Sequence, residues 1–420
     1  MESWEFALRR AVLSGGAEIL SRLLEEFGSG RQGGPMLCSC GCRMKSRGKK
    51  KKRIKTILGE IEFKRAVFVC PSCGTVRVPA DELLDVVGTG FSPGVRRLMA
   101  RAGQRGAFRE GRDDLEVFAE ILVSAKDVER VAEGTGQKVE AWQAEERAAL
   151  LEGREEPAAG SKTIPRIYVS CDGTGVPMVQ RELAGRKGKQ PNGGSKTREV
   201  KLGCVFTQTG TNEKGFPIRD EDSTTFVGAI ETAAEFGSRL YAEALRRGLR
   251  SAEEGAFLAD GARYNWDIAD LHFPGFTQIV DLYHAREHLH DLCVLMLPKG
   301  ERDLLFLEMR WRTMLDEGRV LDIVDEARAS KPKSGQRRRP IEREIGYFMN
   351  NAHRMRYDVF RARGFFVGSG VIEAGCKTVV AKRLKQSGMK WSLRGANSII
   401  ALRCAHLAGR MEDFWERDVA

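Results

Sequence analysis

The chain has 420 residues, a length typical of about two to three domains. Hydrophobic residues make up 42% of it and charged residues 30%, which excludes a wholly disordered chain. No apolar run reaches the ~18 residues of a membrane span, and the N-terminus does not resemble a secretory signal, so we expect a cytoplasmic protein. The net charge of +11 favours a polyanionic partner, nucleic acid before membrane.

Residues 1–35 begin with apolar residues at helical spacing, from Phe6 to Leu24, and predict an N-terminal helix that ends in the glycines from Gly28 onward. Residues 36–80 are different, because cysteines open and close a run of strand-forming residues. This pattern predicts a zinc-ribbon-like segment, since two cysteine turns supply the four tetrahedral ligands of zinc. A segment of about 45 residues has too little core to fold without such a ligand.

The predicted ligands of this structural zinc ion are Cys38, Cys40, Cys70 and Cys73. The closing pair is a regular C-x-x-C, whereas Cys42 competes with Cys38 and Cys40 for the opening pair. A redox-active pair is the alternative, but no βαβ pattern surrounds these cysteines.

Between the cysteines, the stretch from Arg43 to Lys55 carries nine basic residues in thirteen. Such a run is either a solvated hairpin tip or a phosphate-binding surface, and release of counterions favours the second. The candidate DNA-binding residues are Arg47, Lys49, Lys50, Lys51, Lys52 and Arg53.

Residues 81–155 are expected to be helical. Ser124 is predicted to cap a helix over 127–133, a turn follows at Gly134–Gly136, and a further helix covers 137–151. Helix, glycine turn and helix are typical of a helix-turn-helix, so this is a possible DNA-binding region, with an ordinary helical hairpin as the alternative. Residues 152–162 predict a linker, after which a new domain begins.

Three apolar runs in this domain each end in an aspartate, at Asp172, Asp260 and Asp281. Ligands of α/β sheets gather at the carboxyl edge of the strands. Closely spaced carboxylates repel one another unless a divalent cation neutralises them, and Mg²⁺ prefers such oxygen ligands. A further strand is predicted over 200–207 and a helix over 228–249.

A third acid, Glu373, lies in the first turn of a helix that Ser369 or Gly370 is expected to cap. Such a Glu can simply complement the helix dipole. An acid followed by basic residues instead suits a metal-bound phosphate with further backbone phosphates beside it. The basic residues concerned are Lys377, Lys382, Arg383 and Lys385.

These residues carry a family resemblance. Asp172, Asp260 and Glu373 resemble the DDE triad of the ribonuclease H-like transposase and retroviral integrase superfamily, most closely the bacterial insertion-sequence transposases related to the Mutator type. Similar proteins carry a C-P-x-C-G element like that at 70–74, a block like residues 368–392, and a D-x-x-H element like that at 281–284.

The resemblance implies a multidomain α+β chain. Its ribonuclease H-like catalytic domain would comprise residues 163–290 and 366–410, with a helical insertion over 291–365. It also implies two-metal phosphoryl transfer, in which Asp172, Asp260 and Glu373 hold two Mg²⁺ or Mn²⁺ ions. His284 would orient the site or contact a phosphate. The implied partners are transposon ends and target DNA, bound by a homodimer or larger synaptic complex in the cytoplasm, associated with the nucleoid.

Three other functions were weighed. A ribonuclease H-like nuclease would cut without joining, and a zinc-ribbon DNA-binding protein would not need the acids at all. The run from His284 to His288 also reads H-x-x-E-H, a zinc peptidase motif. A peptidase explains neither the cysteine segment nor the basic residues, so we expect a transposase.

Overall fold

The computed structural model describes residues 1–27, 35–154, 163–188, 190, 193–297, 301–331 and 335–419. The chain is a mixed α+β protein with two compact units, Met1–Thr135 and Gly136–Ala420. The glycines at 28–34 and most of the predicted linker, residues 155–162, lie outside the described residues. No described helix is long and apolar enough to cross a membrane.

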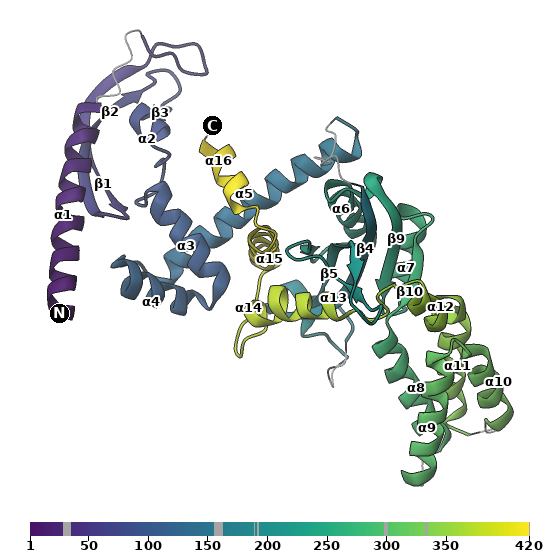
Figure 1. The fold of residues 1–420 in the computed structure, drawn as a ribbon. Coiled ribbons are helices and arrows are strands. Elements are labelled where there is room, and N and C mark those ends of the chain that lie inside the picture. The colour runs from purple at the N-terminus through teal and green to yellow at the C-terminus, as the bar shows by residue number, and fades with distance from the viewer. Residues whose placement is uncertain are drawn as a thin grey trace. The chain divides into compact units, whose positions relative to one another are not determined.

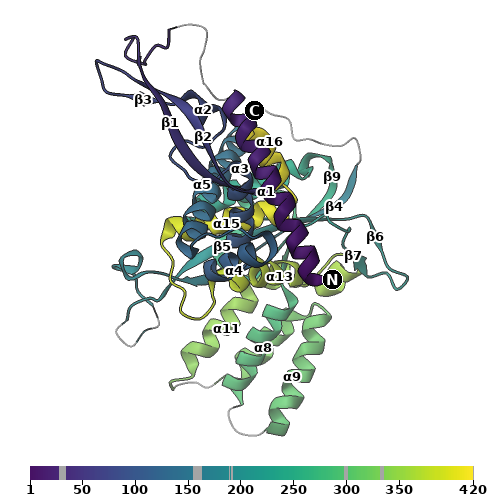
Figure 2. The same ribbon diagram turned by 90° about the vertical axis from the view of Figure 1, so that its left-hand side faces the viewer.

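The first unit is built on a long hairpin. Helix α1 (Glu2–Phe27) lies against β1 (Lys45–Thr56) and β2 (Gly59–Val69), and the short β3 (Val76–Arg77) adds a third strand (Figure 2). Buried apolar side chains of α1 and the hairpin, among them Ala17, Ile54 and Phe63, form one cluster. Both the N-terminal helix and the hairpin between the cysteines are therefore confirmed.

The helices α2 (Pro79–Leu83), α3 (Pro93–Arg105), α4 (Phe108–Ala119) and α5 (Ala125–Leu151) follow. Ser124 caps α5 as predicted, since its hydroxyl accepts from the Asp127 N–H at 3.0 Å. The predicted turn at Gly134–Gly136 is wrong, because α5 continues through it, and with it the helix-turn-helix at this place is wrong. Gly136 serves packing instead: a Cβ there would lie 2.2 Å from the carbonyl oxygen of Ser398 in α15 (Leu393–Leu407).

The second unit contains a five-stranded sheet in the order β10–β9–β4–β5–β8 (Figure 1). These strands are β4 (Ile164–Pro177), β5 (Thr197–Gln208), β8 (Thr225–Ala229), β9 (Ala252–Ala259) and β10 (Thr277–Val280). β9 runs parallel to β4 and β10, whereas β5 is antiparallel to β4 and β8. The ladder of β4 with β5 continues from Asp172 to Pro177, so the prediction that this strand stops at Asp172 is wrong.

Helices cover both faces of the sheet. Adjacent residues of a strand point to opposite faces. On β5, a Cβ at Gly203 would lie 2.6 Å from Leu240 of α6 (Ala233–Arg246), whereas Leu202 lies against Gly375 at the end of α13 (Gly370–Gly375). Helices α6 and α13 therefore cover opposite faces. The β6–β7 ribbon (Gly210–Thr211, Pro217–Ile218) and two short 3-10 turns (Gln180–Leu183, Leu249–Ser251) complete the edges.

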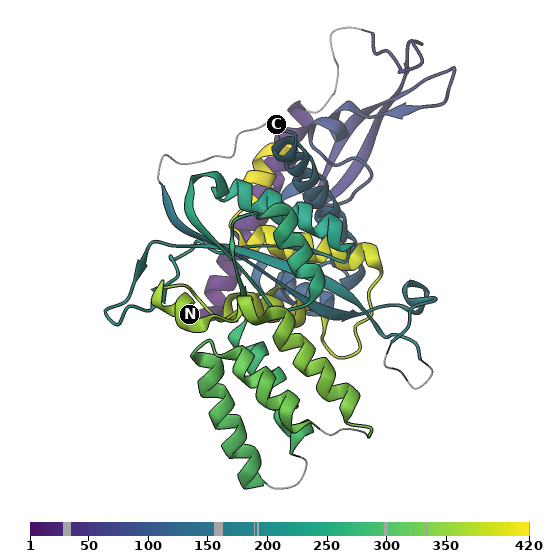
Figure 3. The same ribbon diagram turned by 90° about the vertical axis from the view of Figure 1, so that its right-hand side faces the viewer.

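A run of helices separates β10 from Glu373 and begins before the predicted helical segment 291–365. It comprises α8 (Leu282–Met296), α9 (Glu301–Asp316), α10 (Val320–Ser330), α11 (Arg338–Asn351) and α12 (Tyr357–Ala362), the green helices of Figure 3. Tyr357 donates a hydrogen bond to the carbonyl of Val280 at 3.0 Å and so ties α12 to the end of β10. After α13, a π-helical stretch (Cys376–Ala381) leads through α14 (Lys382–Leu384) to α15 and α16 (Met411–Val419).

Candidate functional site

Three aspartates form a row across adjacent strands. The last pairs of the two parallel ladders are Ser170 with Leu258 and Ala259 with Val280. Continued in register, these ladders bring Asp172, Asp260 and Asp281 to the same level. Neighbouring strands lie about 4.8 Å apart, so the three carboxylates share one edge of the sheet.

Asp172 sits within β4 and is half-buried. Its Oδ1 accepts from the Gly173 N–H at 2.6 Å, and its Oδ2 accepts from the thiol of Cys376 at 3.3 Å. Burial raises the pKa of Asp172 and nearby Asp260 raises it further, against the opposing hydrogen bonds and His284. A carboxylate destabilised in this way is one that a cation would stabilise.

Asp260 follows β9 directly and is held in a tight turn. Its Oδ1 accepts from the Ala262 N–H and from the side-chain amide of Asn265, both at 2.9 Å. The hydroxyl of Tyr347, from α11 of the insertion, donates to the Asp260 carbonyl at 3.0 Å. Gly261 adopts a φ of +99°, and a Cβ there would lie 2.7 Å from the Tyr347 ring. The insertion therefore helps to position the second acid.

Asp281, His284 and Glu373 form a compact cluster. Asp281 is fully buried and caps α8: its Oδ2 accepts from the His284 N–H at 3.0 Å and from His284 Nδ1 at 2.6 Å. Its Oδ1 accepts from the Ser369 N–H at 2.7 Å. One potential ligand atom from each of Asp281, His284 and Glu373 lies within 4.8 Å of the others.

The hydrogen bond to Asp281 raises the pKa of His284 to about 9. Burial acts to raise the pKa of Asp281, but the hydrogen bonds from His284 and Ser369 lower it overall. The pair is thus an ionised carboxylate beneath an imidazolium when no metal ion is bound. Ser369 also donates from its hydroxyl to Glu373 Oε1 at 3.3 Å, which links the two elements that meet here.

The predicted triad is therefore divided between two neighbouring groups. Asp172 and Asp260 lie together, whereas Glu373 lies with Asp281 and His284. Cys376, one turn after Glu373, reaches Asp172 and connects the groups. Within the described ranges, the only other group of at least three closely spaced His, Cys, Asp or Glu residues is the cysteine cluster. The carboxylates of Asp172, Asp260 and Glu373 are oxygen donors of the kind that suits Mg²⁺ or Mn²⁺.

Neither the role of Cys376 nor the contact of Asp281 with the Glu373 helix was predicted from the sequence. The spacing of Cys376, three residues after Glu373 on a helix, is the signal that places both side chains on one face. His288, the second histidine of the peptidase motif, bonds instead to Glu344 at 2.7 Å and stacks on Tyr347 at 3.7 Å. The two histidines have different partners, which gives the peptidase motif no support.

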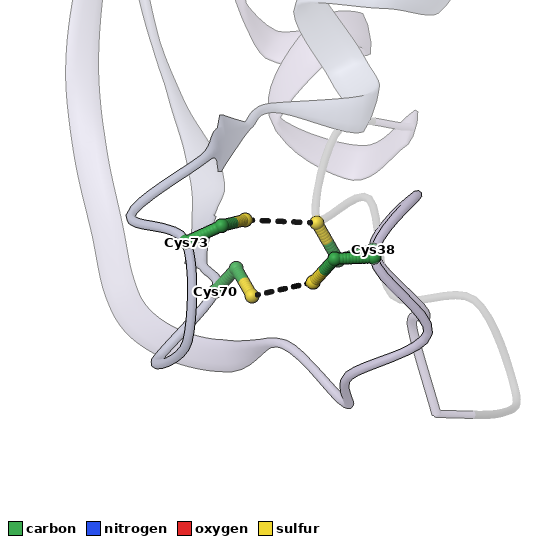
Figure 4. A group of neighbouring side chains, drawn as sticks. Cys38, Cys70 and Cys73 are labelled. Carbon is green, nitrogen blue, oxygen red and sulfur yellow. Dashed lines mark hydrogen bonds between the residues drawn. The ribbon is translucent and has the colours of Figure 1, made fainter.

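The cysteine cluster joins two turns of the first unit. Figure 4 shows Cys38 beside Cys73, with their sulfurs 3.5 Å apart, and the sulfurs of Cys40 and Cys70 are also 3.5 Å apart. The chain reverses at Gly41 and Gly74, whose φ values are +81° and +72° and whose N–H groups bond back to Cys38 and Cys70. The gathered set, without Cys42, is compatible with a tetrahedral zinc site.

The thiols of Cys38 and Cys40 have different pKa values. A hydrogen bond from the Cys40 backbone, followed by one from the Cys73 thiol, lowers the pKa of Cys38 to about 6. The Cys42 backbone acts to lower the pKa of Cys40, but the thiols of Cys70, Cys38 and Cys73 raise it to about 12. The protein alone thus stabilises the Cys38 thiolate, whereas Cys40 needs a cation to ionise at neutral pH.

The basic tract forms strand β1, not the hairpin tip considered above. Lys51 and Arg53 pair with Glu62 at 2.5 and 3.0 Å, and Lys52 pairs with buried Asp81 at 2.9 Å. Lys52 is only 11% exposed in its side chain, so its assignment to DNA binding is corrected: it stabilises the fold. Arg47, Lys49 and Lys50 are exposed, and Lys51 and Arg53 are exposed as well although they pair with Glu62.

The basic residues after Glu373 also differ in exposure. Lys377, Lys382 and Lys385 are exposed, and Lys385 hydrogen-bonds to Thr174, two residues beyond Asp172. Arg383 is fully buried, with its guanidinium 4.9 Å from the Trp391 ring centre, so its assignment to DNA binding is corrected as well. Arg383 lies in α14, where its burial makes it a packing residue.

No family model and no curated protein matches this chain. Among solved structures, it is similar to the Drosophila P element transposase strand transfer complex, with a TM-score of 0.26 and 9% sequence identity, over 78% of this chain and 81% of that chain. A similarity at this TM-score carries no argument, so the functional inference rests on the residues themselves.

Proposed function

We propose that this protein is a DNA transposase of an insertion sequence, with a ribonuclease H-like catalytic domain, that cleaves and joins DNA strands at terminal inverted repeats. One observation carries the proposal: Asp172 and Asp260 share the edge of adjacent strands, and the thiol of Cys376 joins the Glu373 helix to Asp172. The helical segment between Asp260 and Glu373 supports it, because the family resemblance implies such an insertion.

Asp172 and Asp260 would hold one divalent ion, and Asp172 with Glu373 a second. Two Mg²⁺ or Mn²⁺ ions bound there supply activation of a water or 3′-OH nucleophile and stabilisation of the leaving oxygen. The chain itself orients the carboxylates: Asn265 and Tyr347 hold the Asp260 turn, and Cys376 and Gly173 hold Asp172.

DNA would be bound by basic side chains of both units. Arg47, Lys49 and Lys50 extend along exposed β1, next to the cysteine cluster that keeps the hairpin folded. Lys377, Lys382 and Lys385 follow Glu373 and would contact backbone phosphates beside the active centre. A transposase joins two ends, so we expect a homodimer or larger complex on chromosomal DNA in the cytoplasm.

The test uses a supercoiled plasmid that carries the DNA flanking the gene. Full-length protein is incubated with it in Mn²⁺, and the 3′ ends of any cuts are mapped. We expect cuts at inverted repeats with the wild type and none with Asp172→Asn, while both proteins bind the same DNA equally. Cuts that persist in Asp172→Asn would rule out the proposed active site.

The alternative functions give different results in the same assay. A ribonuclease H-like nuclease would yield cut ends without any joined product. A non-catalytic zinc-ribbon protein would bind DNA through the exposed basic residues of β1, with no metal-dependent cleavage in either protein.

A further inference from the structure

A buried carboxylate lies behind an accessible imidazole in the Asp281–His284–Glu373 cluster. Asp281 receives three hydrogen bonds, from the backbone N–H groups of His284 and Ser369 and from His284 Nδ1. It is also fully buried. Its oxygens are therefore committed to protein donors, and its role is to orient the imidazole and not to bind an ion itself.

His284 is the cluster member best suited to bind a metal ion. Its Nδ1 is engaged by Asp281 at 2.6 Å, so Nε2 is the nitrogen that can bind a metal ion, with loss of its own proton. Its side chain is 31% exposed, which gives an ion access from solvent. Histidine bound to metal commonly donates its other N–H to a carboxylate, which fixes the ring and raises its basicity.

Resting on the proposed function for Glu373, we propose that His284 Nε2 and the Glu373 carboxylate together bind a divalent transition-metal ion. One ring nitrogen of His284 and one carboxylate oxygen each of Asp281 and Glu373 lie within 4.8 Å of one another, and Ser369 bonds to both Asp281 and Glu373, so the two elements are already joined. Substrate phosphate and water would fill the remaining coordination positions.

This ligand set has a consequence for metal choice. Imidazole is a ligand of transition-metal ions, whereas Mg²⁺ prefers carboxylate and water oxygens. His284 would therefore make the Glu373 position selective for Mn²⁺ over Mg²⁺. The positions at Asp172 and Asp260, which offer only carboxylates, would not distinguish the two ions in this way.

The test measures metal binding without DNA. Full-length protein with zinc already bound to its cysteines is titrated with Mn²⁺, and free Mn²⁺ is followed by electron paramagnetic resonance. We expect the Mn²⁺ affinity of one site to fall at least about tenfold in His284→Gln and in Glu373→Gln. Removal of a residue that merely supports a metal ligand already lowers metal affinity about 10–100-fold. In both variants, Mg²⁺ should compete with Mn²⁺ for the site at Asp172 and Asp260 as strongly as in the wild type.

A matched control comes from the same helix. His290 is exposed and bonded to Glu308 at 3.0 Å, away from the cluster, so His290→Ala should bind Mn²⁺ like the wild type. Pulsed resonance of bound Mn²⁺ should show a nitrogen coupling that His284→Gln removes and His290→Ala keeps. Circular dichroism establishes whether each variant is folded. If His284→Gln does not fold, the presence or absence of a nitrogen coupling in the wild type alone tests whether a histidine binds the ion.

Two results would overturn the inference: no nitrogen coupling in the wild type, or equal Mn²⁺ affinity in the wild type and folded His284→Gln. The proposed function fails separately, since it depends on DNA cleavage. A protein that binds Mn²⁺ through His284 but cuts no DNA would keep this inference and refute the transposase.

Discussion

At the scale of single residues, the thiols of the cysteine cluster set how zinc responds to acid. The pKa of Cys38 is lowered to about 6, so this thiol is ionised at neutral pH and becomes protonated as the pH falls. Zinc binds thiolates only, and binding must also remove the proton from Cys40, whose pKa is about 12 without metal. Protons therefore compete with zinc increasingly as the pH decreases.

We expect full zinc occupancy at pH 7.5 and progressive loss as the pH falls below about 6. A chromogenic chelator that reports released zinc measures this directly. Cys73→Ser should release zinc at higher pH than the wild type, whereas Cys42→Ser should behave like the wild type, because Cys42 lies outside the cluster. Equal release from both variants would contradict the ligand assignment.

Some site residues could be predicted from the sequence and others could not. The aspartates after β9 and β10 were predictable because an Asp that follows an apolar run marks a strand end. The contact of Ser369 with Asp281 was not, because it joins residues 88 apart through the docking of one segment onto another. Likewise, Lys52 and Arg383 read as phosphate contacts by residue type, whereas only the fold buries them.

At the scale of elements, helix α5 packs closely against α15 at Gly136, a residue whose sequence context predicted a turn. A Cβ at Gly136 would lie 2.2 Å from the Ser398 carbonyl oxygen, and backbone cannot move aside cheaply. We expect Gly136→Ala to lower the free energy of unfolding by about 2 kcal/mol or more, as overpacking does.

Gly134 is the matched control, because a Cβ there meets nothing within 4 Å. Alanine is the better helix former, so Gly134→Ala should raise the free energy of unfolding by up to about 1 kcal/mol. Urea denaturation followed by circular dichroism compares the two. Destabilisation by both variants would mean that α5 is broken at these glycines after all.

Strand β1 carries both basic residues that we propose to bind DNA and a lysine that stabilises the hairpin. Lys50→Ala should weaken DNA binding and reduce the salt dependence by about one released counterion, since each phosphate contact releases one. Lys52→Ala should leave that salt dependence unchanged and lower stability by about 1–3 kcal/mol, because it removes a partner of buried Asp81.

Fluorescence anisotropy of labelled DNA over a range of salt concentrations measures the first effect, and urea denaturation measures the second. The assignment of β1 would be wrong if Lys52→Ala altered the salt dependence as much as Lys50→Ala. Sequence alone does not separate the two lysines, because they lie two residues apart on the same side of β1, and only the fold places Asp81 beside Lys52.

At the scale of the whole molecule, a mixed α+β chain could be expected from the sequence, but the arrangement of acids could not be given in full. Apolar runs that end in aspartates predicted strands of the sheet, whereas the helical segment before Glu373 was implied by the family resemblance. The division of the acids into Asp172 with Asp260, and Glu373 with Asp281 and His284, depends on strand order and on the π-helical segment that brings Cys376 to Asp172.

Joining of DNA strands is the central claim, and one measurement tests it most directly. A labelled DNA fragment that ends at the mapped repeat with a free 3′-OH is incubated with a target plasmid, Mn²⁺ and full-length protein. We predict labelled joint molecules with the wild type and none with Asp172→Asn, Asp260→Asn or Glu373→Gln, although all four bind the fragment. Joint molecules formed by these variants, or cleavage by the wild type without any joint product, would contradict the account.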